Sequence, residues 1–152
     1  MNTRERELVF TAHVPFQELH PTALAVYCSD GRFTAAVEEL LSHLGHARLD
    51  TMTIPGGPAL FNIWSAPIIA ADYQLKAASF LIQAHRINKV VLIAHESCGY
   101  YASQARLDPS AIYQEQIEDL HVAARALGST SVEIDKFYAH KFEGGIQFRR
   151  VV

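Results

Sequence analysis

Two cysteines are the only thiol side chains in this 152-residue chain, and each lies at the end of a short apolar segment. Cys28 follows the apolar run at residues 24–27, and Cys98 lies three residues after His95, which follows a second run at residues 90–94. Short runs of this kind, rich in β-branched residues and followed by turns or helix starts, are typical of buried parallel strands. Functional groups of open α/β sheets gather at the carboxyl ends of such strands.

Two thiolates and one imidazole are a ligand set that suits zinc. Three protein ligands, Cys28, His95 and Cys98, would leave a fourth position for water or substrate, which is typical of a catalytic rather than a structural zinc site. An iron–sulfur cluster is disfavoured because such clusters generally use four cysteines. A dithiol redox pair is disfavoured because His95 stands where the first cysteine of a Cys-x-x-Cys unit would be. A phosphatase loop does not fit, since its Cys and Arg need a wider spacing than that of Cys28 and Arg32.

The residues around these ligands resemble those of a known enzyme family. Cys28-Ser29-Asp30-Gly31-Arg32 and His95-Glu96-Ser97-Cys98-Gly99 are similar to the two zinc motifs of the β-class carbonic anhydrases, Cys-x-Asp-x-Arg and His-x-x-Cys-Gly. The motifs come in the expected order, and the resemblance covers about residues 22–128. It implies that Zn²⁺ is bound by Cys28, His95 and Cys98.

The resemblance also implies an activity and an assembly. It implies a lyase that hydrates carbon dioxide to bicarbonate by a zinc-bound hydroxide and that is usually built on a homodimer. Asp30 and Arg32 would be the catalytic pair, in which the guanidinium grips the carboxylate and the carboxylate orients the hydroxide. Released from Arg32, Asp30 could instead occupy the fourth position on the metal.

Three departures from the family pattern keep other functions open. Residues 53–58 read Thr-Ile-Pro-Gly-Gly-Pro where the family usually has an Arg-Asn-Ala-Gly loop. Glu96 would put a carboxylate next to the metal ligands, and Tyr100 would narrow the mouth of the site. The alternatives are a zinc hydrolase of another small electrophile on the same scaffold and a zinc-binding protein without catalysis.

Each of these residues also has a purely structural interpretation. A single buried cysteine is usually a small apolar side chain. Asp30 could belong to a turn or could cap the helix that begins near Phe33. The coincidence of both cysteines with His95, Asp30 and Arg32 favours the metal site.

The rest of the chain predicts the elements that would position this site. Strands are expected at residues 24–29, 47–54, 89–94 and 131–142, with a final antiparallel strand at 146–152, and helices at 33–44, 67–86 and 113–127. Alternating strands and helices predict an α/β fold with a mostly parallel sheet covered by helices. We expect the strand order 2-1-3-4 plus an antiparallel edge strand, and in this order the first and third strands are neighbours.

Composition narrows the class of protein further. The length predicts one domain over residues 1–152, with residues 1–21 as a short N-terminal arm that is polar and irregular. The net charge is −3 and no long basic run occurs, so neither nucleic acid nor membrane is expected as a partner. The start of the chain lacks an apolar signal segment, and the cysteines suggest reduced thiols, so a cytoplasmic location is expected. The expected partners are therefore a small-molecule substrate, carbon dioxide or bicarbonate, and further copies of the chain.

Overall fold

A five-stranded sheet forms the centre of the molecule in a computed structural model, which describes residues 7–104, 106–128 and 131–152. Its order is β2-β1-β3-β4-β5. The strands are β1 (Ala23–Tyr27), β2 (Asp50–Thr53), β3 (Lys89–His95), β4 (Glu133–Phe142) and β5 (Gly145–Arg150). This is the order predicted from the sequence, with the final strand at the edge.

Four of the five strands run parallel. β1 pairs in parallel with β2 and with β3, and β3 pairs in parallel with β4. Only β5, which follows a tight turn, pairs antiparallel with its neighbour β4. Because β1 and β3 are neighbours, with Tyr27 opposite Ile93, their carboxyl ends meet at the same edge of the sheet.

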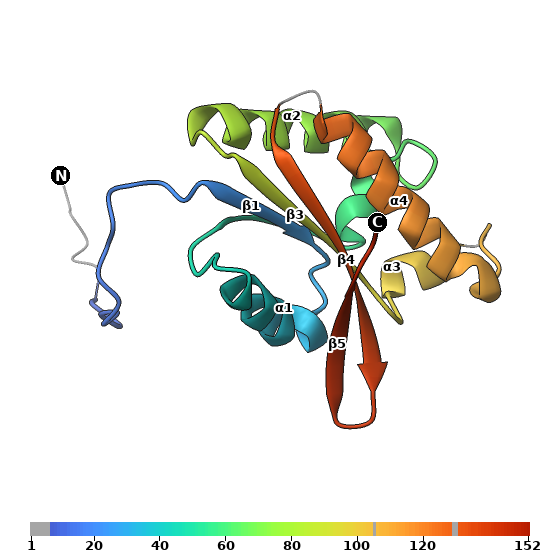
Figure 1. The fold of residues 1–152 in the computed structure, drawn as a ribbon, viewed down its shortest axis with the longest axis horizontal. Helices are drawn as coiled ribbons and strands as arrows, with labels where there is room; N and C mark the ends of the chain where they lie inside the picture. Colours follow the sequence, from blue (N-terminus) through green and yellow to red (C-terminus); the bar gives the residue numbers. More distant parts are fainter. Residues whose placement is uncertain (1–6, 105, 129–130) are drawn as a thin grey trace.

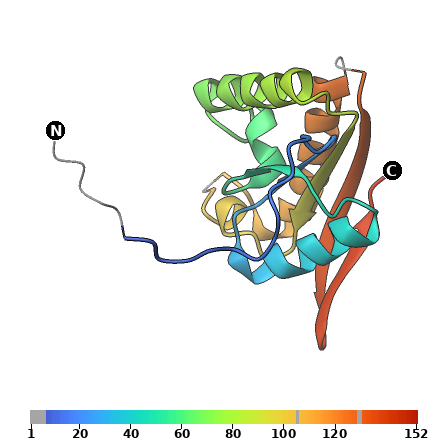
Figure 2. The ribbon, with the colours of Figure 1, turned by 90° about the vertical axis from the view of Figure 1, so that its left-hand side faces the viewer.

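Helices cover both faces of the sheet, as Figures 1 and 2 show. α2 (Ile68–Ala84) and α4 (Ile112–Leu127) lie on one face, and α1 (Gly31–His43) lies on the other. Alternate residues of the strands fill the two cores: Leu24 and Leu92 pack toward α2 and α4, whereas Ala25 and Ile93 pack toward α1. The buried parallel strands are therefore apolar on both faces, which is why they read as continuous apolar runs.

Three short helices were not expected from the sequence. They are the 3₁₀-helices η1 (Gly57–Phe61) and η2 (Pro109–Ala111) and the one-turn helix α3 (Gly99–Ala102). Helices this short contain no full period of apolar residues, so sequence periodicity cannot detect them. η1 and α3 both adjoin the strand ends that carry the cysteines.

The second strand was predicted too long, because residues 47–49 precede β2 as coil. The N-terminal segment at residues 7–22 forms no helix or strand and extends away from the sheet before β1 (Figure 1). The side chains of Val9 and Phe16 are both exposed there. None of the helices described is long and apolar enough to cross a membrane.

Candidate metal centre

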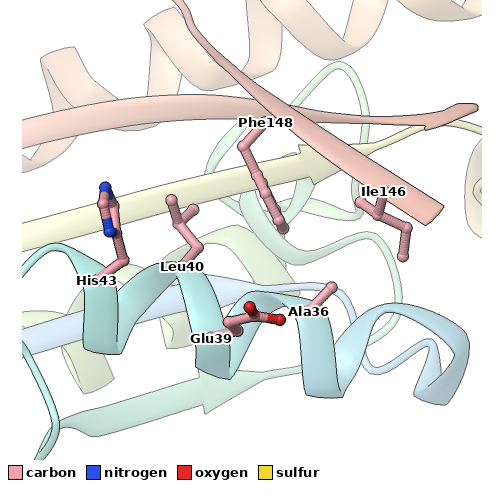
Figure 3. A pocket seen from close by; sticks show the side chains of 6 residues that line it. All are labelled: Ala36, Glu39, Leu40, His43, Ile146 and Phe148. Atoms are coloured by element: carbon pink, nitrogen blue, oxygen red, sulfur yellow. The ribbon is translucent and has the colours of Figure 1, made fainter.

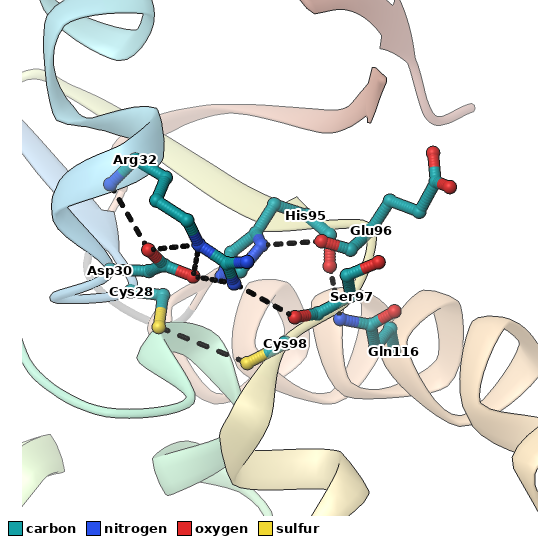
Figure 4. A network of polar contacts seen from close by, with 8 residues as sticks. All are labelled: Cys28, Asp30, Arg32, His95, Glu96, Ser97, Cys98 and Gln116. Carbon is teal, nitrogen blue, oxygen red and sulfur yellow. Dashed lines mark hydrogen bonds and ion pairs between the residues drawn. The ribbon is translucent and has the colours of Figure 1, made fainter. Parts of the chain in front are cut away.

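The ends of β1 and β3 bring the two cysteines and His95 together (Figure 4). Cys28 follows β1, His95 is the last residue of β3, and Cys98 precedes α3. One potential ligand atom from each residue lies within 4.8 Å of the others, and all three residues are buried. The Sγ atoms of the cysteines are 3.8 Å apart. Residues distant in the sequence thus form a cluster that could hold a metal ion.

The imidazole of His95 is oriented with one nitrogen toward this cluster. Its Nδ1 lies 2.8 Å from the carbonyl oxygen of Glu96. A carbonyl can only accept, so Nδ1 carries the proton and Nε2 keeps its lone pair. Nε2 is buried and meets no hydrogen-bond partner among the described residues. A buried acceptor without a partner is costly, and a metal ion would satisfy it, so the residues present fit zinc.

The electrostatics of the two cysteines also suit a cation. The hydrogen bond from Cys98 lowers the pKa of Cys28 and outweighs burial, which raises it. The same hydrogen bond and burial raise the pKa of Cys98. The pair therefore favours one thiolate and one thiol, and a bound cation would favour thiolate at both positions.

Asp30 and Arg32 form a two-pronged ion pair beside the cluster. Arg32 Nε lies 2.9 Å from Asp30 Oδ1, and Arg32 Nη2 lies 2.5 Å from Asp30 Oδ2. The guanidinium also donates to the carbonyl oxygen of Ser97, at 3.2 Å, which links the first sequence motif to the second. Arg32 holds the pKa of Asp30 at about 2, so the carboxylate is charged at neutral pH.

Asp30 has a structural role as well. Its Oδ1 accepts a hydrogen bond from the backbone N–H of Arg32, at 3.0 Å, and so caps the N-terminus of α1. A capping carboxylate satisfies one of the free amides of the first helical turn. The structural and the functional interpretations of Asp30 are therefore compatible in one conformation.

The loop at residues 55–58, here called the glycine loop, lies against the backbone of Cys28. A Cβ atom on Gly57 would fall 2.7 Å from the carbonyl carbon of Tyr27 and 2.8 Å from the amide nitrogen of Cys28. Gly57 also has a φ of +49°, in the left-handed region that favours glycine. The loop thus replaces the Arg-Asn-Ala-Gly signature with a segment that has no room for a side chain at this position.

A buried side chain, Gln116, supports the backbone of His95 and was not identified from the sequence. Gln116 of α4 donates from Nε2 to the His95 carbonyl oxygen, at 2.8 Å, and accepts from the Tyr138 hydroxyl, at 2.8 Å. Gln116 shares the buried face of α4 with Leu120 and Leu127. A polar residue in line with apolar ones on a helix was the signal that could have identified it.

The Glu96 side chain differs from what the sequence suggested. The Glu96 carboxylate accepts a hydrogen bond from the backbone N–H of Lys141, at 2.9 Å, and it points away from the two sulfurs in Figure 4. Glu96 therefore links the loop after β3 to β4, and its carboxylate does not lie beside the candidate metal ligands. Tyr100 packs on the glycine loop and donates to the carbonyl oxygen of Ser65, at 2.5 Å.

A hollow of about 460 Å³ borders the cluster at Cys98. It is lined by Glu96, Ser97, Cys98, Ala102, Pro109, Ile112, Tyr113 and Tyr138. A separate hollow of about 290 Å³ lies between α1 and β5 and is lined by Ala36, Glu39, Leu40, His43, Ile146 and Phe148 (Figure 3). No residue of the Cys28, His95 and Cys98 cluster lines this second hollow. Of these two hollows, the first borders the candidate metal centre, through Cys98.

Comparison with known proteins was informative at the level of structure only. No protein-family model matches the chain, and no curated protein matches its sequence. Solved structures do match. A β-carbonic anhydrase from Trichomonas vaginalis superposes with a TM-score of 0.54 at 14% identity, over 89% of this chain and 86% of that one.

Two fungal structures give the same result. The β-carbonic anhydrase CafA of Aspergillus fumigatus superposes with a TM-score of 0.52 at 14% identity, over 88% of this chain and 77% of that one. A tetrameric β-carbonic anhydrase from Sordaria macrospora superposes with a TM-score of 0.50 at 12% identity, over 86% of this chain and 81% of that one. The chain has the β-carbonic anhydrase fold. This confirms the architecture that the two sequence motifs implied.

Within this β-carbonic anhydrase fold, the structure brings together all five residues singled out from the sequence. Cys28, His95 and Cys98 form the cluster, and the Asp30–Arg32 pair lies beside it through the contact of Arg32 with Ser97. The arrangement can hold a divalent metal and can keep one carboxylate charged and oriented near it.

Proposed function

We propose that the protein is a zinc-dependent carbonic anhydrase that hydrates carbon dioxide to bicarbonate. The observation that carries the proposal is the buried Cys28, His95 and Cys98 cluster on a β-carbonic anhydrase fold, with His95 Nε2 unpartnered among the described residues. Zinc bound by these residues would act as a Lewis acid that lowers the pKa of a coordinated water and supplies a nucleophile at neutral pH.

The residues of the chain contribute orientation and charge. The Nδ1–H of His95 donates to the Glu96 carbonyl, which fixes the ring so that Nε2 faces the two sulfurs. Such a hydrogen bond also makes the free nitrogen a better ligand. Gln116 fixes the backbone carbonyl of His95 from the other side. The ligand is thus held before any metal arrives.

The Asp30–Arg32 pair would orient the reacting water. The charged carboxylate can accept a hydrogen bond, and its grip by Arg32 limits the directions in which it can turn. The hollow beside Cys98 is lined mainly by apolar and aromatic side chains, which suits a small uncharged substrate such as carbon dioxide better than a large or ionic one.

The decisive experiment joins metal analysis to a rate measurement. Elemental analysis of protein purified without chelator is expected to give one zinc per chain, and stopped-flow assay is expected to show carbon dioxide hydration. Cys98→Ser should lower both, because a neutral hydroxyl replaces a thiolate ligand. Zinc without hydration would favour the hydrolase or non-catalytic alternatives, and no zinc after anaerobic reconstitution would exclude all three.

Arg32→Ala tests the role assigned to the ion pair. Without the guanidinium, the Asp30 carboxylate loses its partner, and a divalent ion becomes its best available one. The variant is expected to keep zinc but to lose hydration, with Arg32→Lys as a control that retains the charge without the two-pronged geometry. Full activity in Arg32→Ala would show that the pair is only a local salt bridge.

We also propose that the protein works as a homo-oligomer in the cytoplasm. One of the structures with this fold is described as tetrameric, and the chain exposes several large apolar side chains on α2, among them Ile69, Tyr73 and Phe80. Cytoplasmic location is consistent with two cysteines that lie close together as free thiols.

A further inference from the structure

The ring of Tyr100 lies directly on the backbone of Gly56 in the glycine loop. A Cβ atom on Gly56 would fall 2.6 Å from Cδ1 and 2.8 Å from Cγ of Tyr100. Gly56 also has a φ of +82°, a conformation that side chains rarely adopt. Two independent constraints, the ring and the backbone angle, therefore require glycine at this position.

The glycine loop lies against the backbone of the first candidate ligand. Gly57, the residue after Gly56, has no room for a side chain: a Cβ atom there would fall 2.7 Å from the carbonyl carbon of Tyr27 and 2.8 Å from the amide nitrogen of Cys28. Any shift of the loop would therefore disturb the backbone that carries Cys28.

Tyr100 makes further contacts besides the one with Gly56. Its hydroxyl donates to the carbonyl oxygen of Ser65, at 2.5 Å. Its ring packs edge-on against Tyr101, with the centroids 5.7 Å apart. The hydroxyl of Tyr101 in turn donates to the buried carboxylate of Asp119, at 2.5 Å. Tyr100 follows Cys98 by two residues. Its ring therefore connects the segment that carries Cys98 to the glycine loop beside Cys28.

We propose that Tyr100 is a positioning residue of the metal centre: its ring holds the glycine loop against the backbone of Cys28 and thereby slows the loss of metal. The inference rests on the zinc binding proposed above, and it goes beyond it by assigning a role to a residue outside both zinc motifs. Contacts that fix the position of a metal ligand belong to the outer shell of groups that tune metal affinity.

Zinc release to a chromogenic chelator tests the proposal directly. Tyr100→Ala removes the ring and is expected to speed zinc release by about 10–100-fold, the range typical for the loss of an outer-shell partner. Tyr100→Phe keeps the ring and is expected to release zinc at close to the wild-type rate. Equal rates in wild type and Tyr100→Ala would overturn the proposal.

Tyr101→Phe is the matched control. It removes the hydrogen bond to Asp119 but leaves the contact between Tyr100 and Gly56 intact. It is expected to lower the midpoint of thermal unfolding without changing zinc release. If Tyr101→Phe speeds release as much as Tyr100→Ala, the effect comes from general loosening of the fold and the proposed role is wrong.

A double-mutant cycle separates the ring contact from backbone strain. Gly56→Ala strains the backbone in either background, because φ stays positive, but its Cβ meets the ring only when Tyr100 is present. Gly56→Ala should therefore speed zinc release more in the wild type than in Tyr100→Ala. Strictly additive effects would contradict the proposed contact.

Hydrogen exchange tests the role of Tyr100 independently of zinc binding. In metal-free protein, Tyr100→Ala is expected to speed amide exchange at Ile54, Gly56 and Gly57, whereas Tyr101→Phe is not. If the wild type takes up no zinc, the proposed function fails, but the exchange measurement still decides whether Tyr100 holds the glycine loop. Unchanged exchange in Tyr100→Ala would show that it does not.

Discussion

The Asp30 side chain has two roles, a helix cap and an ion pair with Arg32, and a substitution can separate them. Its Oδ1 accepts from the backbone N–H of Arg32 at the start of α1, while both carboxylate oxygens receive the guanidinium. The cap needs only a side-chain oxygen that accepts a hydrogen bond. The ion pair needs a charge. A substitution that keeps the oxygen and removes the charge therefore distinguishes stability from activity.

Asp30→Asn is expected to keep most of the stability and to lose most of the activity. Asparagine caps a helix about as well as aspartate, whereas Asp30→Ala should lower the free energy of unfolding by about 1 kcal/mol. Urea unfolding measures the first effect and stopped-flow hydration the second. If Asn and Ala destabilise equally, the cap contributes nothing; if Asn turns over normally, the carboxylate charge is not used.

Asp119 is the most deeply buried carboxylate near the centre. It accepts hydrogen bonds from Asn62, Ser65 and Tyr101, at 2.6, 2.9 and 2.5 Å. Burial raises the pKa of Asp119 despite these three donors, because an ionised group loses more solvation than they restore. The network ties η1 to α3 and α4, and so supports the loops that carry the centre.

Tyr101→Phe is expected to destabilise the fold by about 1–3 kcal/mol, the usual cost of removing a partner from a buried polar group. The loss should appear in urea unfolding with an unchanged dependence on denaturant concentration. Tyr138→Phe is the comparison, because it removes a hydroxyl that donates to a neutral acceptor, Gln116. It should lower the free energy of unfolding by less. An equal loss in both would mean that the charge of Asp119 does not matter.

At the scale of elements, an ion cluster joins the last three strands of the sheet. Asp135 of β4 pairs with Lys89 of β3, at 2.6 Å, and with Arg150 of β5. Partial burial alone would raise the pKa of Asp135, but the two cations outweigh burial and lower it. The carboxylate is thus more acidic in the folded protein than in the unfolded chain.

This shift predicts acid sensitivity. A carboxylate whose pKa is lower in the folded state contributes stability above its unfolded pKa of about 3.9, and that contribution is lost as the pH falls through the folded value. The free energy of unfolding should therefore drop below about pH 4. Asp135→Asn should be less stable at pH 7 and should show a smaller drop. An unchanged acid profile in Asp135→Asn would assign the drop to other groups.

The strands were predictable because their residues are apolar on both faces. Val90 packs in the core toward α4, and Val91 packs in the core toward α1. Burial on both faces therefore explains why both residues are apolar. The strand order was also predicted correctly, and it makes β1 and β3 neighbours. All five predicted site residues consequently lie at this one edge.

The contacts around the site could not be predicted in the same way. Gly56 and Tyr100 touch only because η1 and α3 fold back onto the strand ends, and elements this short have no periodic signature. The direction of the Glu96 side chain depends on an amide of Lys141 in another strand. Neither contact follows from local propensity, since each joins segments that are distant along the chain.

At the scale of the whole molecule, α2 presents an apolar surface without cover from the described residues. Ile69, Tyr73 and Phe80 are exposed and follow one another at helical spacing on one face. Trp64 in the preceding loop is 79% exposed. Monomeric soluble proteins rarely expose contiguous apolar patches of this kind, so a second copy of the chain is the occupant expected there.

Ile69→Glu is expected to convert the assembly to monomers, because a charge would be buried against an apolar partner surface. Sedimentation velocity at micromolar concentration measures the change. Ala35→Glu adds the same charge at an exposed position of α1 and should leave the assembly intact. A wild type that sediments as a monomer would contradict the proposed oligomer.

The separation of the two cysteines along the chain has a consequence for the order of folding. Cys28 and Cys98 lie 70 residues apart, and they meet only after β1 has aligned with β3. Contacts between such distant residues form late, because the entropy of closing a long loop must be overcome first. Zinc would therefore bind a chain whose central sheet is already complete. It would stabilise the folded state by slowing unfolding, and it would have little effect on the rate of folding.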